Sequence, residues 1–426
     1  MPLANINKHM GAEKKMDKLQ NEIRTILEQV GQEHRGFPEV NWFLKTMEQA
    51  FSAETLISEK PSLIVLGEDI PRELALALSD HPRFILGGSL ETTHWSDALL
   101  PRDADPVSRS ACGWLLNEEF NLTENAIVIM ALSSDNRRKL ASLLRGKGIR
   151  VATADMPPRH DTSEARDTWT AEMLRLADAV SAHTHIRLSA HRLKAAIRRR
   201  EQVREAVIDF ENTTWQATDS MSPALRDIIM ESAWYAPDRK EWAYHLRSLT
   251  AQITAWVRQY YHQPDERPWV LLAGSPIVFP NEKLPNLLEA SGLYLADRAD
   301  AIALQTDIPC ADAGHSVQRM LRRTADLRMR METSGSWISN DGLLSAVQNR
   351  LEHLPVSGII WHVLKGQIEY DFELPKVEAL AAEYDVPVIR LETDYQQQDV
   401  EQLRIRLEAF AEMLRVRNQE RIRIAQ

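Results

Sequence analysis

Two adjacent arginines, Arg137 and Arg138, follow a short apolar run and a turn that contains two serines. Asp135 is expected to cap a helix that extends through Leu144, which places both arginines in its first turn. Backbone N–H groups, the helix dipole and two guanidinium groups together suit a phosphate, so both arginines are candidate ligand-binding residues. The alternative interpretation is a pair of arginines that face solvent.

Cysteine and histidine do not form a complete metal site in the sequence. Only Cys112 and Cys310 occur, far apart in the chain, so neither a disulfide framework nor a Cys-x-x-Cys site is expected. His183, His185 and His191 lie close together, but no carboxylate or thiol completes a set of about four ligands. Their more ordinary role is to lead into a helix, and we expect no metal.

Short strands alternate with helical patterns in two parts of the chain. The apolar runs SLIVLG, RFILGG, NAIVIMALSS and GIRVATADMPP lie in residues 61–161, and PWVLLAGSP, SGLYLADRAD, SGIIWHVLKG and DVPVIRLETDY lie in residues 266–426. Residues 1–60 have helical spacing without strand signals, and residues 162–265 contain long amphipathic patterns. The sequence therefore predicts a helical lead-in, two α/β domains with mostly parallel sheets, a helical block between them and a C-terminal helix.

The composition is that of an ordinary globular protein of 426 residues, long enough for two or three domains. The net charge of −10 argues against nucleic acid as the main partner, because binding to a phosphate backbone needs a broad basic surface. No apolar stretch has the length of a signal peptide or of a membrane span. We therefore expect a cytoplasmic protein that does not bind membranes.

Ligands of open parallel sheets bind beyond the carboxyl ends of the strands. The loops expected at those ends are residues 87–93, 133–139, 274–283, 365–372 and 392–399. Trp361 and His362 lie near the end of one predicted strand, where an indole can border a pocket and an imidazole can contact a ligand. Both are candidate ligand-binding residues, although packing is the default role of a tryptophan.

Several of these loops carry motifs of a known family. The stretch GSPIVFPNEKLPNLLEASG resembles GCPMxxPNxKLPxLIExSG of the 2-hydroxyacyl-CoA dehydratase and benzoyl-CoA reductase subunit family. SGIIWHVLKGQIEYDFELPKVE resembles DGVIxxxLKFCDPYxFExPxxK, and PVIRLETDYQQQDVEQLRIRLEAFAEML resembles PVLxLETDYSxxDxGQLRTRxEAFxEML. LPRDADPVSRSACG and ALSSDNRRKLA are similar to LPRxxCPxxKSSxG and TTCDGKKKLA. The resemblance covers about residues 80–415.

The resemblance implies two flavodoxin-like or Rossmann-like domains with a helical part, in one subunit of a heterodimer. In this family each subunit usually holds a cubane iron–sulfur cluster on cysteines, and a separate ATP-hydrolysing activator supplies one electron. The complex then removes water from a 2-hydroxyacyl-CoA by ketyl radical chemistry, or reduces an aromatic acyl-CoA. The implied ligand is a CoA thioester, and the implied partners are a cluster-bearing paralogous subunit and an activator.

The cysteines of the family motifs are absent from this sequence. Four other residues stand at the matching positions, namely Asp105, Ser134, Ser275 and Gln367. Iron–sulfur clusters need soft thiolate ligands, with imidazole as an occasional substitute, so hydroxyl and amide groups are poor replacements. We expect no cofactor in this chain and a 4Fe-4S cluster only in a partner subunit.

Ser89 and Glu91 lie just after a predicted strand, near the acyl pocket that the resemblance implies. A serine hydroxyl can hydrogen-bond a thioester carbonyl and a carboxylate can move a proton, so both are candidate catalytic residues. No base is visible beside Ser89, which argues against a hydrolase triad. The ordinary alternative is a turn followed by the start of a helix.

Three functions are consistent with the sequence. The first is a subunit of a dehydratase or reductase complex that binds or positions a CoA thioester and does no redox chemistry of its own. The second is a non-catalytic protein that binds or senses an acyl-CoA or a nucleotide on the same fold. The third is an enzyme that uses the four replaced positions for other chemistry.

Overall fold

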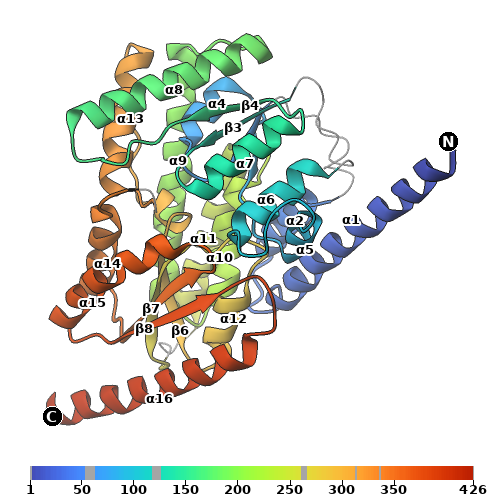
Figure 1. Cartoon of the computed structure of the whole chain (residues 1–426). Helices are drawn as coiled ribbons and strands as arrows, with labels where there is room; N and C mark the ends of the chain where they lie inside the picture. The colour runs from blue at the N-terminus through green and yellow to red at the C-terminus, as the bar shows by residue number, and fades with distance from the viewer. Residues whose placement is uncertain are drawn as a thin grey trace.

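The apolar runs of the first half form a four-stranded parallel sheet in the computed structural model (Figure 1), which describes residues 2–52, 63–117, 126–260, 266–311, 314–334 and 337–425. The strands lie in the order β2-β1-β3-β4, with bounds β1 (Leu63–Leu66), β2 (Arg83–Ile85), β3 (Ile127–Ala131) and β4 (Val151–Ala154). Every residue of the central strands β1 and β3 is buried. Their continuous apolar sequence follows from this burial, because helices cover both faces of the sheet.

The second half builds a sheet with the same topology. Its order is β6-β5-β7-β8, with bounds β5 (Trp269–Gly274), β6 (Tyr294–Asp300), β7 (Gly358–Leu364) and β8 (Val388–Thr393), and all pairs are parallel. In both sheets the second strand along the chain lies on one side of the first strand, and the third and fourth strands lie on the other side. This arrangement confirms the predicted α/β fold with two parallel-sheet units.

Two helical layers enclose the first sheet. Alternate residues of its strands point into two different cores, one with Ile64 and Val128 and the other with Val65 and Ile129. The helices that contribute to the first core are α1 (Pro2–Val30), α2 (Val40–Ala50), α6 (Pro106–Leu116), α7 (Asp135–Gly146), α10 (Pro223–Glu231) and α11 (Arg239–Gln259). The second core is lined by α4 (Arg72–Leu78), α8 (Ser163–Thr184) and α13 (Val317–Met331), while α9 (Ala190–Gln216) contributes to both cores.

Helices also cover both faces of the second sheet. One face packs against α12 (Lys283–Ala290) and α16 (Val400–Ala425), and the other packs against α14 (Asp341–His353) and α15 (Leu374–Glu383). The remaining short elements are α5 (Leu90–Trp95) and the 3-10 helices η2 (Ser232–Trp234), η3 (Ala303–Gln305) and η4 (Ile368–Phe372). Packing on both sides thus fixes each sheet in place, and this fixes the positions of the loops at the carboxyl ends of the strands.

Helix α13 belongs in sequence to the second half but packs on the first. It lies beside α8 (Figure 1), and Arg322 Nη2 donates a hydrogen bond of 3.1 Å to Ser163 Oγ at the start of α8. The connection between β6 and β7 therefore ties the two halves together. The boundaries of the four sequence-derived segments stay predictions, and residues 60, 61 and 265 at those boundaries lie outside the described residues.

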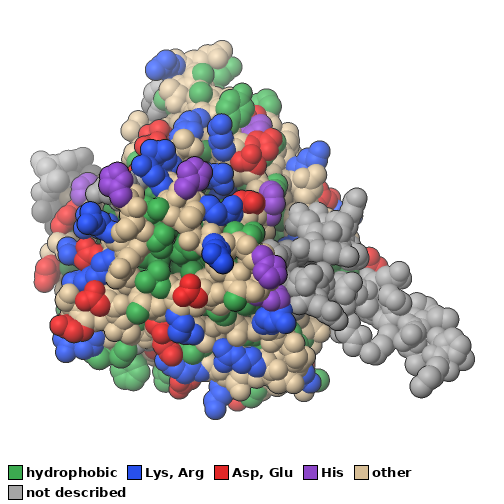
Figure 2. Space-filling view, turned by 90° about the horizontal axis from the view of Figure 1, so that it is seen from above, with side chains coloured by type: hydrophobic (Ala, Val, Ile, Leu, Met, Phe, Trp, Pro, Cys, Tyr) green, Lys and Arg blue, Asp and Glu red, His purple; other side chains and the backbone are tan. Residues whose placement is uncertain are grey.

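The charges of the surface are mixed. Figure 2 shows Lys and Arg side chains interspersed with Asp and Glu side chains over the described part of the face seen from above. Helices α1 and α16 extend from the body on opposite sides (Figure 1). Among the described residues, none of the helices combines the length and the apolar character that a bilayer span requires.

Ionisable groups are buried where β6 meets the loop after β5. Arg298 Nε donates a hydrogen bond of 2.8 Å to Asp300 Oδ2, and Arg298 Nη1 lies 3.7 Å from Asp227 Oδ2. Glu282 is also buried, and its Oε2 has no hydrogen-bond partner among the described residues. Burial, together with the neighbouring charge of Glu231, raises the pKa of Glu282 to about 8, although Arg298 opposes this shift.

We expect Glu282→Gln to reduce the pH dependence of stability. Because the pKa of Glu282 is raised from 4.5 to about 8, the folded protein retains a proton that the unfolded chain loses within this window. The free energy of unfolding therefore falls as the pH rises through this window, by up to about 1.4 kcal/mol per pH unit from this group. Glutamine cannot ionise, so the variant should gain stability relative to the wild type as the pH rises, as measured by urea unfolding.

The control is Glu383→Gln, which removes an exposed carboxylate from α15. Its unfolding curves should follow those of the wild type at each pH. Parallel pH profiles for Glu282→Gln and the wild type would contradict the assignment of a buried, protonated Glu282.

Candidate functional site between the two sheets

The loops at the carboxyl ends of the two sheets meet at one interface. Tyr395, after β8, donates its hydroxyl hydrogen to the carbonyl of Gly87, after β2, at 2.9 Å. Asn136, in the first turn of α7, donates from Nδ2 to the carbonyl of Gly366, after β7, at 3.4 Å. Residues distant in sequence are therefore brought together where parallel sheets usually bind ligands.

Asp105 and Ser134 are the N-cap residues of two helices at this interface. Asp105 Oδ1 accepts a hydrogen bond of 2.9 Å from the backbone N–H of Ser108 at the start of α6. Ser134 Oγ accepts one of 3.2 Å from the backbone N–H of Arg137, so Ser134 caps α7 and the expectation that Asp135 caps it is wrong. Both side chains satisfy N–H groups that have no partner within the helix.

Ser275 and His362 form a fully buried polar contact near the end of β7. Ser275 Oγ accepts a hydrogen bond of 2.9 Å from the backbone N–H of Leu364. His362 Nδ1 lies 3.0 Å from the Ser275 carbonyl and Nε2 lies 2.8 Å from Thr393 Oγ1, which assigns the donor to Nδ1 and the acceptor to Nε2. Burial lowers the pKa of His362 to about 4, so the imidazole is neutral and both of its nitrogens are engaged.

Gln367 precedes η4 and lies on the loop that touches Asp105. Its Oε1 is buried without a hydrogen-bond partner among the described residues. The neighbouring Gly366 has φ +85°, and a Cβ at this position would lie 2.9 Å from the backbone nitrogen of Asp105. The two backbones are therefore in close contact, and glycine is required on steric grounds as well as for its positive φ.

The four replaced positions do not fit an iron–sulfur cluster. A hydroxyl, an amide and a carboxylate are hard or neutral donors, whereas clusters bind thiolate. Three of the four side chains already accept backbone hydrogen bonds, and the Asp105 and Gly366 backbones leave little space between their loops. The two cysteines are elsewhere: Cys112 lies in the first core, and the Cys310 sulfur lies 3.3 Å from Arg200 Nη1.

The structure separates the two arginines of α7. Arg138 is exposed and lies 3.5 Å from Asp135 Oδ1. Arg137 is buried over Gly67, and its Nη2 lies 3.5 Å from Glu68 Oε2. Arg137 thus has a carboxylate partner, which weakens its availability to a phosphate.

Glu68 is a site residue that the sequence reasoning missed. It follows β1 directly, and Arg328 Nη2 donates to its carbonyl at 3.1 Å. Burial raises the pKa of Glu68 to about 7, Asp69 adds to the rise and Arg137 opposes it. The loop after β1 lies at the carboxyl end of a parallel strand, like the loops selected from the sequence. Its place after a predicted strand could therefore have identified Glu68.

Ser89 and Glu91 face α1. Ser89 is the N-cap of α5, and its Oγ accepts from the backbone N–H of Thr92 at 3.2 Å. The Ser89 hydroxyl also donates to Glu22 Oε2 of α1 at 2.7 Å, and Glu91 lies 3.9 Å from Lys18 on the same helix. The Ser89 hydroxyl is fully engaged in these contacts.

Trp361 lies within the second sheet. Its side chain is 0% exposed and packs in the core with Leu271, Ile359 and Val377. The indole therefore supports β7 from inside, one residue before His362.

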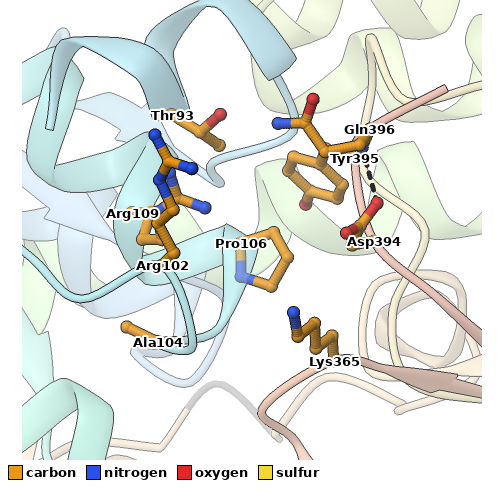
Figure 3. A pocket seen from close by; sticks show the side chains of 9 residues that line it. All are labelled: Thr93, Arg102, Ala104, Pro106, Arg109, Lys365, Asp394, Tyr395 and Gln396. Carbon is orange, nitrogen blue, oxygen red and sulfur yellow. Dashed lines mark hydrogen bonds between the residues drawn. The ribbon is translucent and has the colours of Figure 1, made fainter. Parts of the chain in front are cut away.

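A pocket opens beside the replaced positions (Figure 3). The space between its walls, with the open solvent at its mouth included, is about 260 Å³. The lining residues come from both halves and are Thr93, Arg102, Ala104, Pro106, Arg109, Lys365, Asp394, Tyr395 and Gln396. Ala104 and Pro106 flank Asp105, and Lys365 lies two residues before Gln367, so the pocket adjoins two of the replaced positions.

Comparison with known proteins finds relatives along most of the chain. A family model described as 2-hydroxyglutaryl-CoA dehydratase, D-component, matches residues 69–414. The chain is similar to Putative dehydratase subunit YjiM of Escherichia coli (strain K12), with 25% identity over 353 residues that cover 81% of this chain and 89% of the relative. It is also similar to the (R)-phenyllactyl-CoA dehydratase beta subunit of Clostridium sporogenes, with 20% identity over 354 residues and the same coverage, 81% and 89%.

Replacing Ser134 by alanine is expected to lower the free energy of unfolding by about 1 kcal/mol, because the first turn of α7 loses its cap. The matched control is Ser142→Ala, which removes an exposed hydroxyl from the middle of the same helix. The control should leave stability unchanged or raise it by a few tenths of a kcal/mol. Urea unfolding of both variants measures the difference, and equal effects would show that Ser134 does not cap α7.

Proposed function

The chain belongs to the 2-hydroxyglutaryl-CoA dehydratase D-component family, and we propose that it binds or positions a CoA thioester in a 2-hydroxyacyl-CoA dehydratase or benzoyl-CoA reductase-like complex, without an iron–sulfur cluster of its own. Both relatives are named as dehydratase subunits, which supports a role as one component of a dehydratase-type assembly. The binding of a CoA thioester, the type of reaction and the absence of a cluster go beyond family membership and are proposed.

The observation that carries the proposal is the donor set at the four replaced positions. Asp105, Ser134 and Ser275 accept hydrogen bonds from backbone N–H groups that need an acceptor. Gln367 offers a neutral amide oxygen, which is not a ligand for the soft iron of a cluster. A chain with these donors is best suited to structural and binding roles in a complex whose redox centre lies elsewhere.

The partner in this proposal is a paralogous subunit that carries the 4Fe-4S cluster, and the assembly is a heterodimer. The name of the Clostridium sporogenes relative, a beta subunit, supports an assembly of unlike subunits. An ATP-hydrolysing activator would supply the electron to the partner rather than to this chain. When bound there, the cluster supplies one-electron chemistry to the complex.

The contribution of this chain is to bind and orient the thioester and to hold or release a proton. Glu68 Oε2, beside Arg137 Nη2, has a pKa near 7 and can hold or release a proton in the neutral range. Arg138, exposed at the start of α7, is suited to contact a phosphate of the ligand. Ser89, Glu91, Trp361 and His362 support the loops around the site, since their described contacts are with the protein.

A second candidate function is a small-ligand binding or regulatory protein on the same fold. The observation in its favour is the pocket between the halves, which adjoins Asp105 and Gln367 and is lined by three basic residues. In this case the chain would bind an acyl-CoA or a nucleotide without a catalytic partner. The two functions differ in whether a cysteine-bearing subunit copurifies.

We expect the chain, purified without oxygen, to be colourless and to contain far less iron than one cluster per polypeptide. Coexpression with the paralogous cysteine-bearing subunit should give a stable complex, and its iron should depend on cysteine residues of the partner. Iron analysis and anaerobic absorption spectra measure both results.

The control is the same complex with serine at the cluster-binding cysteines of the partner, which should assemble but lack iron. A stoichiometric cubane in the isolated chain contradicts the absence of a cluster. A stable homodimer that never captures the cysteine-bearing subunit contradicts the role as a complex subunit and leaves the regulatory function.

A further inference from the structure

We infer that the pocket in Figure 3 binds a phosphate group of the ligand, clamped between the two halves of the chain. This inference deepens the proposed function and rests on it for the identity of the whole ligand. The phosphate site itself follows from the lining residues. A CoA thioester and a nucleotide both carry phosphate groups.

Three cations converge on the pocket from both halves. Arg102 and Arg109 come from the first half, before and within α6, and Lys365 comes from the end of β7 in the second half. The lining contains one carboxylate, that of Asp394. Arginine forks and a lysine ammonium around a small cavity are the donors that bind phosphate oxygens.

The single carboxylate of the lining is already engaged. Asp394 Oδ1 accepts a hydrogen bond of 2.7 Å from the backbone N–H of Gln396 and lies 4.0 Å from Lys283 Nζ. The Gln396 N–H group and Lys283, which is not a lining residue, therefore offset part of the charge of Asp394. The lining itself carries three cations against this one carboxylate, while Asp97 and Asp103, the partners of Arg109 and Lys365, lie outside the lining.

Arg109 is the fixed element of the site. Its side chain is buried on α6 and its Nη2 pairs with Asp97 Oδ1. Its Nε has no hydrogen-bond partner among the described residues. A buried guanidinium N–H without an acceptor is unfavourable, so an anionic oxygen that enters the pocket can supply the acceptor that the protein lacks.

Arg102 and Lys365 are the solvent-exposed cations of the site. Arg102 is exposed, and the Lys365 side chain is 48% exposed, with its Nζ 3.8 Å from Asp103 Oδ1. An exposed pair at this distance contributes little. Both side chains are therefore free to turn toward a phosphate without breaking a strong contact.

The size of the pocket restricts which part of a ligand it can hold. The space of about 260 Å³ includes open solvent at the mouth, so the enclosed part of the pocket is smaller than this. The pocket therefore suits one charged group, with the rest of the ligand outside. Because the lining residues come from both halves, a bound phosphate also links them.

The test uses the full-length chain and three probes: inorganic phosphate, CoA and ATP. We expect saturable binding by calorimetry and a higher thermal midpoint at saturating probe. Arg102→Gln and Lys365→Gln should each weaken binding about tenfold, the effect of losing one hydrogen bond to a charged group. Both residues are exposed, so these variants should keep the thermal midpoint of the free protein.

The matched controls are Arg319→Gln on α13 and Lys139→Gln on α7, which remove the same charges from exposed positions outside the pocket. They should change binding less than twofold. Equal weakening by pocket and control variants, or no saturable binding of any probe, overturns the phosphate site.

The outcomes also separate this inference from the proposed function. If CoA binds and neither pocket variant weakens it, the phosphate site is wrong and CoA binding stands. If inorganic phosphate and ATP bind through Arg102 and Lys365 but CoA binds no more tightly than phosphate alone, the phosphate site stands and the CoA-thioester role is wrong.

Discussion

Backbone N–H groups at the strand ends must find acceptors, and this constraint governs the whole site. Helices α6 and α7 begin there, and the last residue of β7 has its N–H directed at the loop after β5. Asp105, Ser134 and Ser275 supply oxygen acceptors to these three groups. Their side chains therefore hold the loops in place, and a role as metal ligands would compete with these hydrogen bonds.

The close approach of the two halves depends on small residues, and a neutral imidazole is buried inside the second half. A Cβ on Gly88 would lie 2.2 Å from the carbonyl oxygen of Val278, so only glycine allows these loops to touch. His362 is neutral because a charge in its buried position would be strongly desolvated. The contact between the halves thus depends on glycine, whereas the neutral His362 contacts Ser275 and Thr393 within the second half.

The sheets could be predicted from the sequence because a buried parallel strand is a continuous apolar run, as in residues 63–66. The partners of charged residues could not. Arg137 pairs with Glu68, 69 residues away, and Ser89 bonds Glu22, 67 residues away, and periodicity carries no information about such contacts. The packing of α13 on the first half was equally invisible, because an amphipathic pattern identifies an apolar face but not its neighbour. The replaced positions could be located by motif, whereas their capping roles needed the structure.

Cysteine at the four replaced positions would not by itself rebuild a cluster site. Sulfur is a weak hydrogen-bond acceptor, so a thiol at Ser134 or Asp105 would leave the first turns of α7 and α6 poorly capped. The backbones of Gly366 and Asp105 are also in contact, and a cube of iron and sulfur between them would have to push the loops apart. In this chain the oxygen acceptors and the close packing support each other. The interface therefore favours contact between the halves over a cluster, which supports the proposal that the redox centre lies in a partner subunit.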